Sequence, residues 1–188
     1  MKFKITLKID RKYGDLLPFN YQYEQSAVIY RILAQADTQY SSWLHENGYL
    51  LHERKRFKLF CYSPFIFEKV RPLPEAGCLK IIGERAVWYI SFIPEKSTLE
   101  FIQGIFAHQS FSIGNKKYQV AFDVVGVEAI PMPQLSEEMT FVALSPICVK
   151  LHEDNKTQYL SPDNPMFAEG VLKGLMARYE SIHGQPFD

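Results

Sequence analysis

Three side chains in the first third of the sequence, Tyr30, His45 and Lys58, are of the types that can cleave RNA without a metal ion. In that reaction a ribose 2′-hydroxyl attacks the neighbouring phosphate, so one group must accept the 2′ proton and another must protonate the departing 5′ oxygen. A cation offsets the charge that develops on the phosphorane. A phenol, an imidazole and an ammonium group can fill these three roles if the fold brings them together.

The three groups differ in how readily they exchange protons. Histidine, with an ordinary pKa of about 6.5, is ready for proton transfer near neutral pH. Tyrosine has an ordinary pKa of about 10 and needs a nearby cation, here Lys58, to stabilise its phenolate. We therefore assign Tyr30 as general base, His45 as general acid and Lys58 as phosphate clamp. The sequence leaves the roles of Tyr30 and His45 exchangeable.

Tyr30 and His45 also have structural interpretations. At 100° per residue, Tyr30 lies at the edge of an apolar helical stripe that contains Ile29 and Leu33, so its ring could belong to a core. His45, in the segment SSWLHENGY, could equally be an ordinary surface histidine. The spacing by itself favours the packing role for Tyr30.

A basic run, Arg54-Lys55-Arg56, leads directly into the segment that carries Lys58. Together with Arg31, these residues are candidate contacts to RNA phosphates, which position a nucleic acid without reading its bases. A run of this kind is also common in a solvated loop, so the interpretation depends on the surrounding fold.

The formal net charge is zero, which argues against a protein that binds polyanions through overall charge. The charge is nevertheless uneven. Residues 1–94 hold 14 Lys and Arg against 9 Asp and Glu, a net +5, and residues 95–188 hold 7 against 12, a net −5. A phosphate-bearing partner is therefore expected on the first half.

The composition is that of a globular protein with one core or two small ones, since 47% of the 188 residues are hydrophobic. The three cysteines form no Cys-x-x-Cys motif and the five histidines no metal-ligating pair, which predicts a reduced protein without structural zinc. The N-terminus alternates in polarity rather than forming a signal peptide, and no apolar run approaches a membrane span. We expect a cytoplasmic protein with no cofactor, metal or membrane partner.

Residues 3–9 alternate in polarity and predict a half-buried strand. A helix follows the loop at Pro18, with Asn20 as a candidate N-cap, and runs to about Ala36. The segment that carries His45 is expected to be a loop or a short helix. Further strands are predicted at residues 57–62, 79–83, 86–93, 110–113 and 117–125, and a second helix at residues 94–108.

Two details of this assignment can be checked directly. The strands at 79–83 and 86–93 are expected to form a hairpin around Gly83-Glu84-Arg85. The second helix is expected to bury a face formed by Leu99, Ile102, Ile105 and Phe106. The order of elements is that of a ferredoxin-like βαββαβ unit in an α+β protein, and we place this first domain at residues 1–128.

After a linker, Ile130-Pro-Met-Pro-Gln, residues 134–188 read as part of a second ferredoxin-like domain. A strand at 140–151, interrupted at Pro146, can pair with residues 158–162, and a helix follows from Pro165 to about Ile182. Such a half would leave sheet edges and apolar faces open. We therefore expect either that the chain is shortened at its C-terminus or that a partner, which could be a second copy in a homodimer, covers the open half.

Four separated segments resemble a known family over nearly the whole chain: LPFNYQYEQSAVIYRIL, WLHENGY, KLFCYS and TFVALSPICVKL. They are similar to the CRISPR-associated endoribonucleases of the sixth Cas family, within the RAMP superfamily. The resemblance implies tandem ferredoxin-like domains and metal-independent cleavage of the precursor transcript inside each repeat, which makes guide RNAs for antiviral defence. The products would carry a 2′,3′-cyclic phosphate and a 5′-hydroxyl.

Residue by residue, the helix tyrosine of this family aligns with Tyr30, the histidine of its LHE segment with His45 and the lysine of its KLF segment with Lys58. The family normally ends in a glycine-rich loop that helps to hold the RNA. The ten glycines of this chain are scattered, so the resemblance implies weaker RNA affinity.

Two other functions remain open. A non-catalytic RAMP-type scaffold subunit of a CRISPR effector complex would bind RNA but would not need Tyr30, His45 and Lys58 together. A ferredoxin-like module that binds a small ligand or a protein would agree with the zero net charge, but not with the four RAMP-like segments.

Overall fold

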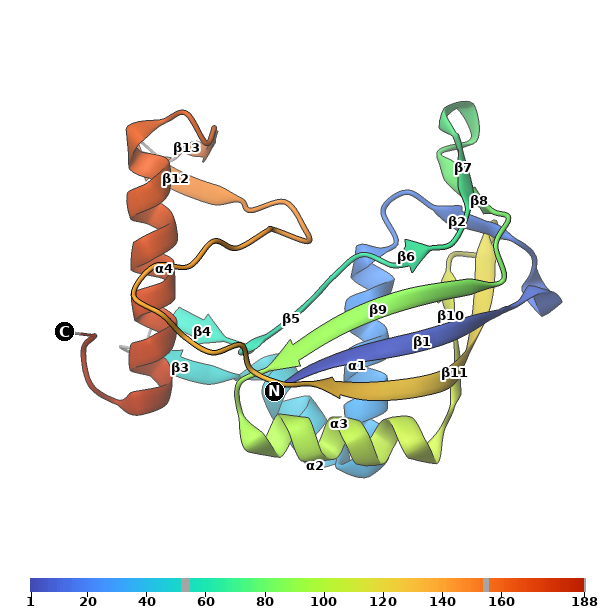
Figure 1. Cartoon of the computed structure of the whole chain (residues 1–188), viewed down its shortest axis with the longest axis horizontal. Helices are drawn as coiled ribbons and strands as arrows, with labels where there is room; N and C mark the ends of the chain where they lie inside the picture. Colours follow the sequence, from blue (N-terminus) through green and yellow to red (C-terminus); the bar gives the residue numbers. More distant parts are fainter. Residues whose placement is uncertain (52–54, 154–155, 188) are drawn as a thin grey trace. The chain divides into compact units, whose positions relative to one another are not determined.

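The computed structural model describes residues 1–51, 55–153 and 156–187, and the chain forms two compact units (Figure 1). Unit 1 contains Met1–His45 and Phe60–Met139, and unit 2 contains Glu46–Leu59 and Thr140–Asp188. The segment that leads to Lys58 therefore groups with the C-terminal part of the chain. The domain boundaries 1–128 and 134–188 stay a prediction.

The sheet of unit 1 has the strand order β10-β11-β1-β9-β5, and β6 also pairs with β9. Its pairings are antiparallel, and β11-β1-β9-β5 is the order expected for the four strands of a ferredoxin-like unit, which confirms the predicted fold class. The strands are β1 (Lys2–Asp10), β5 (Phe60–Tyr62), β6 (Ile66–Phe67), β9 (Arg85–Phe92), β10 (Ser110–Gly114) and β11 (Gln119–Ile130).

Unit 1 also holds a small sheet of order β2-β8-β7 and three helices. The additional strands are β2 (Leu16–Pro18), β7 (Val70–Leu73) and β8 (Cys78–Ile81), with short 3-10 helices at Arg11–Tyr13 and Pro74–Ala76. The helices are α1 (Gln22–Ala36), α2 (Thr38–Glu46) and α3 (Glu95–Ala107).

The core of unit 1 lies between the main sheet and its helices, and Figure 1 shows α1 and α3 on the same side of the sheet. Alternate residues of β1 are buried, as its period of two predicts, and the Phe3 ring lies 6.3 Å from that of Phe101 on α3. The two helices approach closely at Gly104, where a Cβ would lie 1.8 Å from the carbonyl oxygen of Ile32.

Gly104 also explains why the predicted buried face of α3 is mostly wrong. Leu99 and Phe106 are 52% and 61% exposed, whereas Phe101, Gly104 and Ile105 are buried. Because backbone contact with α1 can occur only on the side of the glycine, the helix buries the face that contains Gly104 and turns Leu99 and Phe106 outward.

Two strand predictions are also wrong. Residues 57–62 do not form one strand, because β4 (Lys55–Phe57) and β5 separate at Leu59, which has a φ of 55°. The predicted hairpin at residues 79–93 does not exist, because β8 pairs with β2 and β7 whereas β9 pairs with β1 and β5. The predicted cap of α1 is shifted by one residue, from Asn20 to Tyr21.

Within its described residues, unit 2 contains two antiparallel pairs of strands and a helix. The strands are β3 (Tyr49–Leu51), β4, β12 (Val149–Glu153) and β13 (Lys156–Leu160), and the helix is α4 (Pro165–His183). The pairing of β12 with β13 confirms the predicted second-domain hairpin, although the strand is shorter than predicted and begins only at Val149. The Asn164 side chain caps α4 by accepting a hydrogen bond from the Met166 N–H at 2.9 Å.

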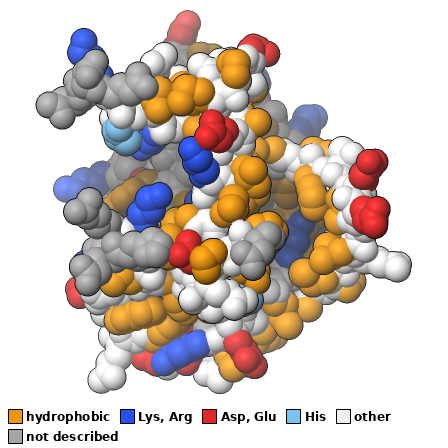
Figure 2. Space-filling model, turned by 90° about the vertical axis from the view of Figure 1, so that its left-hand side faces the viewer, with side chains coloured by type: hydrophobic (Ala, Val, Ile, Leu, Met, Phe, Trp, Pro, Cys, Tyr) orange, Lys and Arg blue, Asp and Glu red, His pale blue; other side chains and the backbone are white. Residues whose placement is uncertain are grey.

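Among the 19 described residues of α4, none is fully buried, and Leu172 and Leu175 are 56% and 60% exposed. Figure 2, which faces the side where α4 lies in Figure 1, shows many hydrophobic side chains at the surface. That a partner or second copy covers this face stays a prediction. Within residues 1–51, 55–153 and 156–187, no helix is both long and apolar enough to cross a membrane.

Candidate functional site

The structure brings Tyr30 and His45 together in unit 1. Their ring centroids are 5.0 Å apart and the rings meet edge to face, at 82°. Tyr30 comes from α1 and His45 from the last turn of α2, and only Asp37 separates the two helices. A phenol and an imidazole in contact form a pair that can both accept and donate protons.

Asp37 makes this sharp helix–helix connection. Its backbone N–H ends α1 by donating to the Leu33 carbonyl oxygen at 2.9 Å. Its carboxylate accepts a hydrogen bond from the Tyr40 N–H at 2.8 Å and so caps the start of α2. The two helices that carry Tyr30 and His45 are therefore joined by one ordered residue.

The Tyr30 ring is half-buried and contacts a second aromatic ring, that of Phe60, at 5.7 Å. Burial raises the pKa of the Tyr30 hydroxyl above its ordinary value, and the neighbouring Tyr62 raises that pKa further. Within unit 1, both influences therefore favour the protonated phenol over the phenolate. That Lys58 stabilises a Tyr30 phenolate stays a prediction.

Lys58 belongs to unit 2, in the link that follows β4. Its side chain lies against Gly48, where a Cβ would be 3.4 Å from Nζ and only 2.6 Å from the Phe57 carbonyl oxygen. Burial lowers the pKa of the Lys58 ammonium below its ordinary value, and the charge of Arg56 lowers it further. The three predicted catalytic residues are thus divided between the units, with Tyr30 and His45 in one and Lys58 in the other.

Gly48 gives a testable consequence, because it has a φ of +66° as well as a crowded Cβ position. A side chain in the left-handed region costs about 1–2 kcal/mol, and overlap with the Phe57 carbonyl oxygen adds about 1–3 kcal/mol. We expect Gly48→Ala to lower the free energy of unfolding, measured with urea, by about 2–4 kcal/mol.

Gly77 provides the matched control, since its φ is +64° but nothing lies within 4 Å of its Cβ position. Gly77→Ala should lower the free energy of unfolding only by the cost of the left-handed backbone conformation, about 1–2 kcal/mol. Equal losses in the two variants would mean that the chain at Gly48 is not constrained by Phe57 and Lys58.

The predicted phosphate contacts lie in different surroundings. Arg31 is exposed, but its guanidinium donates to the Ser112 carbonyl oxygen at 3.2 Å, on β10. Arg56 donates to the Glu46 carbonyl oxygen at 2.9 Å, at the end of α2. Lys55 is exposed on β4, and Arg54 lies outside the described residues.

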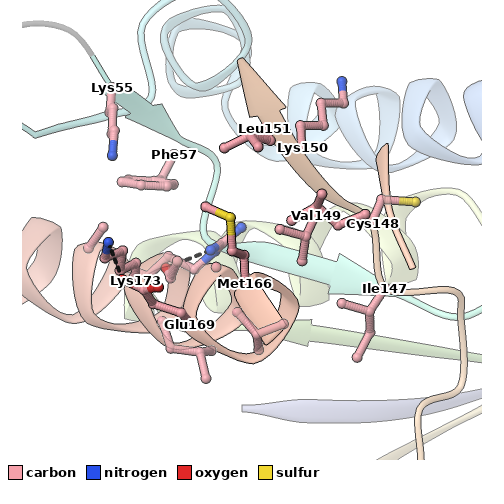
Figure 3. Close-up of a pocket in the computed structure, with 17 residues that line it drawn as sticks. Lys55, Phe57, Ile147, Cys148, Val149, Lys150, Leu151, Met166, Glu169 and Lys173 are labelled. Atoms are coloured by element: carbon pink, nitrogen blue, oxygen red, sulfur yellow. Dashed lines mark hydrogen bonds and ion pairs between the residues drawn. The ribbon is translucent and has the colours of Figure 1, made fainter. Parts of the chain in front are cut away.

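Lys55 also borders a cavity of about 890 Å³ within unit 2, between β4, β12 and α4 (Figure 3). Its walls are largely aliphatic, and Lys173 on α4 is paired with Glu169 at 2.6 Å. The Arg178 guanidinium lies over the Phe57 ring, 5.2 Å from its centroid. We interpret this cavity as incomplete packing around α4 rather than as a phosphate site.

Ser41 and Gly48 contact the candidate residues but were missed from the sequence. Ser41 precedes His45 by four residues, a helical spacing that becomes visible only once α2 is known to be a helix. Gly48 lies two residues after the end of α2, where glycine commonly ends helices, and this signal could have been used.

Two descriptions of one protein family match the chain in succession. Residues 16–122 match "CRISPR-associated protein Cas6, N-terminal", and residues 130–188 match "CRISPR associated protein Cas6, C-terminal". These two matches together include the helix with Tyr30, the helix with His45, the Lys58 segment and α4.

Characterised sequences agree with this match. The chain is 26% identical to "CRISPR-associated endoribonuclease Cas6 1" of Methanocaldococcus jannaschii, over 98% of this chain and 68% of that protein. It is 24% identical to "CRISPR-associated endoribonuclease Cas6" of Pyrococcus furiosus, over 98% of this chain and 66% of that protein.

Solved structures show the same fold. A Cas6-related protein from Pyrococcus furiosus is similar with a TM-score of 0.80 at 25% identity, over 100% of this chain and 73% of that one. A structure described as "An RAMP protein binding different RNA substrates" is similar with a TM-score of 0.77 at 25% identity, over 99% of this chain and 73% of that one.

Proposed function

Because this chain belongs to the Cas6 family of CRISPR-associated proteins, we propose that it is a metal-independent endoribonuclease that cleaves CRISPR precursor RNA within its repeats. The observation that carries this proposal is the contact between the Tyr30 and His45 rings, within the part of the chain that matches the N-terminal family description. The products are guide RNAs for antiviral defence, and repeat RNA is the partner.

The raised pKa of Tyr30 supports a reversal of our first assignment of roles. A neutral phenol is a poor base, but it can protonate the departing 5′ oxygen, which as an alkoxide is a far stronger base. His45 is then the group that takes the proton from the 2′-hydroxyl. The 2′ oxygen bonds to phosphorus and the bond to the 5′ oxygen breaks, which leaves a 2′,3′-cyclic phosphate and a 5′-hydroxyl.

Lys58 completes this mechanism as the cation that offsets negative charge on the phosphorane. Its ammonium is partly buried and lies beside Gly48. A cation next to the phosphorane stabilises the charge that develops there in the transition state.

The proposal is tested by incubating the chain with repeat RNA and analysing both new ends. A 2′,3′-cyclic phosphate and a 5′-hydroxyl are expected. A chain that binds the RNA without cutting it would instead be a scaffold, the alternative that agrees with the RNA-binding RAMP structure among the similar folds.

Phosphate contacts by Lys55 and Arg56 lead to a second prediction. We expect Lys55→Ala and Arg56→Ala to weaken RNA binding about equally for all sequences, because phosphate contacts carry no sequence information. Each should reduce the slope of log affinity against log salt by about 0.7, the value for one phosphate of a single strand.

Lys156→Ala is the control, since Lys156 is an exposed lysine of the same unit, on β13. It should leave both the affinity and the slope unchanged. A loss that is selective for one repeat sequence would show that Lys55 or Arg56 reads bases.

A further inference from the structure

A buried hydroxyl connects α2 to the backbone of the catalytic tyrosine. Ser41 is only 6% exposed, and its Oγ donates a hydrogen bond of 2.8 Å to the carbonyl oxygen of Tyr30. That carbonyl lies in the middle of α1, and an oxygen of this kind can accept a second hydrogen bond besides the one within its helix. The contact therefore ties α2 to α1 at the level of Tyr30 itself.

Ser41 and His45 lie on the same face of α2, because residues four apart in a helix are neighbours. The face thus makes two successive contacts with Tyr30. The Ser41 hydroxyl meets its carbonyl oxygen, and one turn later the His45 ring meets its phenol ring at 5.0 Å. A rotation of α2 about its axis would break both contacts together.

Further contacts of α2 fix its start and a neighbouring side of the helix. Asp37 caps the helix, and Tyr40 hydrogen-bonds through its hydroxyl to Ser97 on α3. The Lys96 ammonium lies 4.8 Å from the Tyr40 ring centroid and pairs with Asp37 at 3.2 Å. The Tyr40 and Asp37 contacts hold α2 against α3. Towards α1, the Thr38 hydroxyl donates to the Ala34 carbonyl oxygen at 3.0 Å, and the Ser41 hydroxyl holds α2 at Tyr30 itself.

We propose that Ser41 is a positioning residue, whose hydroxyl sets the rotation of α2 and so holds the His45 imidazole against the Tyr30 phenol. This inference rests on the proposed function of Tyr30 and His45. Ser41 itself touches neither the RNA nor a transferred proton. Its effect is on the rate of the chemical step, since misplacing a catalytic group by about 1 Å can cost about 100-fold.

The test compares single-turnover cleavage of repeat RNA with RNA affinity. Ser41→Ala is expected to slow cleavage by about 10- to 100-fold and to leave the Kd unchanged. The control is Thr98→Val, because Thr98 is also 6% exposed on a helix and its hydroxyl donates to the carbonyl oxygen of Pro94, the residue that precedes α3, at 3.1 Å. That variant should cleave at the unmodified rate.

A double variant distinguishes the positioning role of Ser41 from the catalytic role proposed for His45. If Ser41 acts through His45, adding Ser41→Ala to His45→Ala should cause little further loss, because the two changes remove the same contribution. If His45→Ala is slow but Ser41→Ala cleaves normally, the role of Ser41 is wrong and the proposed function stands. If Ser41→Ala weakens binding, or slows the double variant further, Ser41 is not acting through His45 and the inference fails.

A spectroscopic measurement tests the positioning independently of cleavage. The His45 ring protons lie beside the Tyr30 ring, so their NMR resonances should show a ring-current shift, identified by its absence in His45→Ala. Ser41→Ala should abolish this shift, and Thr98→Val should preserve it. A shift that survives in Ser41→Ala would overturn the inference even if His45 proved unnecessary for cleavage.

Discussion

His45→Ala should lower the single-turnover rate of repeat-RNA cleavage by about 10²–10⁴-fold, the usual contribution of one general acid or base. The affinity for RNA should change little, because the exposed imidazole at the end of α2 acts on the proton transfer rather than on the phosphate backbone. The measurement is the cleavage rate at saturating protein, together with the Kd from a binding titration.

His108→Ala is the matched control for this variant. His108 is also an exposed histidine of unit 1, at the end of α3, and its backbone N–H bonds to the Gly104 carbonyl oxygen whatever its side chain. It should cleave at the unmodified rate. Equal rates for His45→Ala and the unmodified chain would make His45 an ordinary surface residue.

Tyr30→Phe should have an effect of similar size, about 10²–10⁴-fold on the cleavage rate. The substitution removes only the hydroxyl and keeps the ring that packs against Phe60 and His45. Tyr23→Phe is its control on the same helix, since Tyr23 is 82% exposed, and it should have no effect on cleavage.

The nature of the leaving group distinguishes acid from base. In RNA whose bridging 5′ oxygen is replaced by sulfur, the leaving group is a thiolate, which resembles that of cysteine with a pKa of about 8.5 and needs no acid. If Tyr30 is the acid, Tyr30→Phe should cleave this RNA at nearly the unmodified rate, and His45→Ala should stay slow. If only His45→Ala cleaves this RNA at nearly the unmodified rate, His45 is the acid and Tyr30 is the base.

The ferredoxin-like sheet could be predicted because each of its strands carries its own signal. Residues 3–9 alternate in polarity, and the strand that they form buries Phe3, Ile5, Leu7 and Ile9. The strands predicted at residues 110–113 and 117–125 likewise correspond to β10 and β11. In the turn between them, the Asn115 side chain accepts hydrogen bonds from the Lys117 and Tyr118 N–H groups. Local periodicity and turn chemistry therefore fixed most strand positions.

Pairing partners could not be predicted where one sequence signal has two structural uses. Gly83 looks like a hairpin turn, but its Cβ position lies 2.8 Å from the Glu68 Cβ and 2.9 Å from the Lys69 N. The glycine instead allows two chain segments to approach each other closely. The break at Leu59 had no signal, because residues 59–62 form a continuous apolar run without glycine or proline.

The candidate site was predicted only in part, because the contacts between its residues depend on the fold around them. The types of its residues are visible in the sequence, but the contact of Tyr30 with His45 depends on the sharp connection at Asp37. Whether the pKa of the Tyr30 hydroxyl is raised or lowered depends on how far its ring is buried. The position of Tyr30 at the edge of the predicted apolar stripe does not show whether the ring is buried. The domain boundaries and the roles of Tyr30, His45 and Lys58 remain predictions for the experiments above.

The central claim is that the 2′-hydroxyl of the RNA is the nucleophile and that protein side chains supply the proton transfers. The most direct measurement compares repeat RNA with the same RNA carrying one 2′-deoxy substitution at the cut site, both in EDTA. We predict cleavage of the unmodified RNA to a 2′,3′-cyclic phosphate and no cleavage of the substituted RNA. Cleavage of the deoxy-substituted RNA, or loss of activity on chelation, would contradict this mechanism.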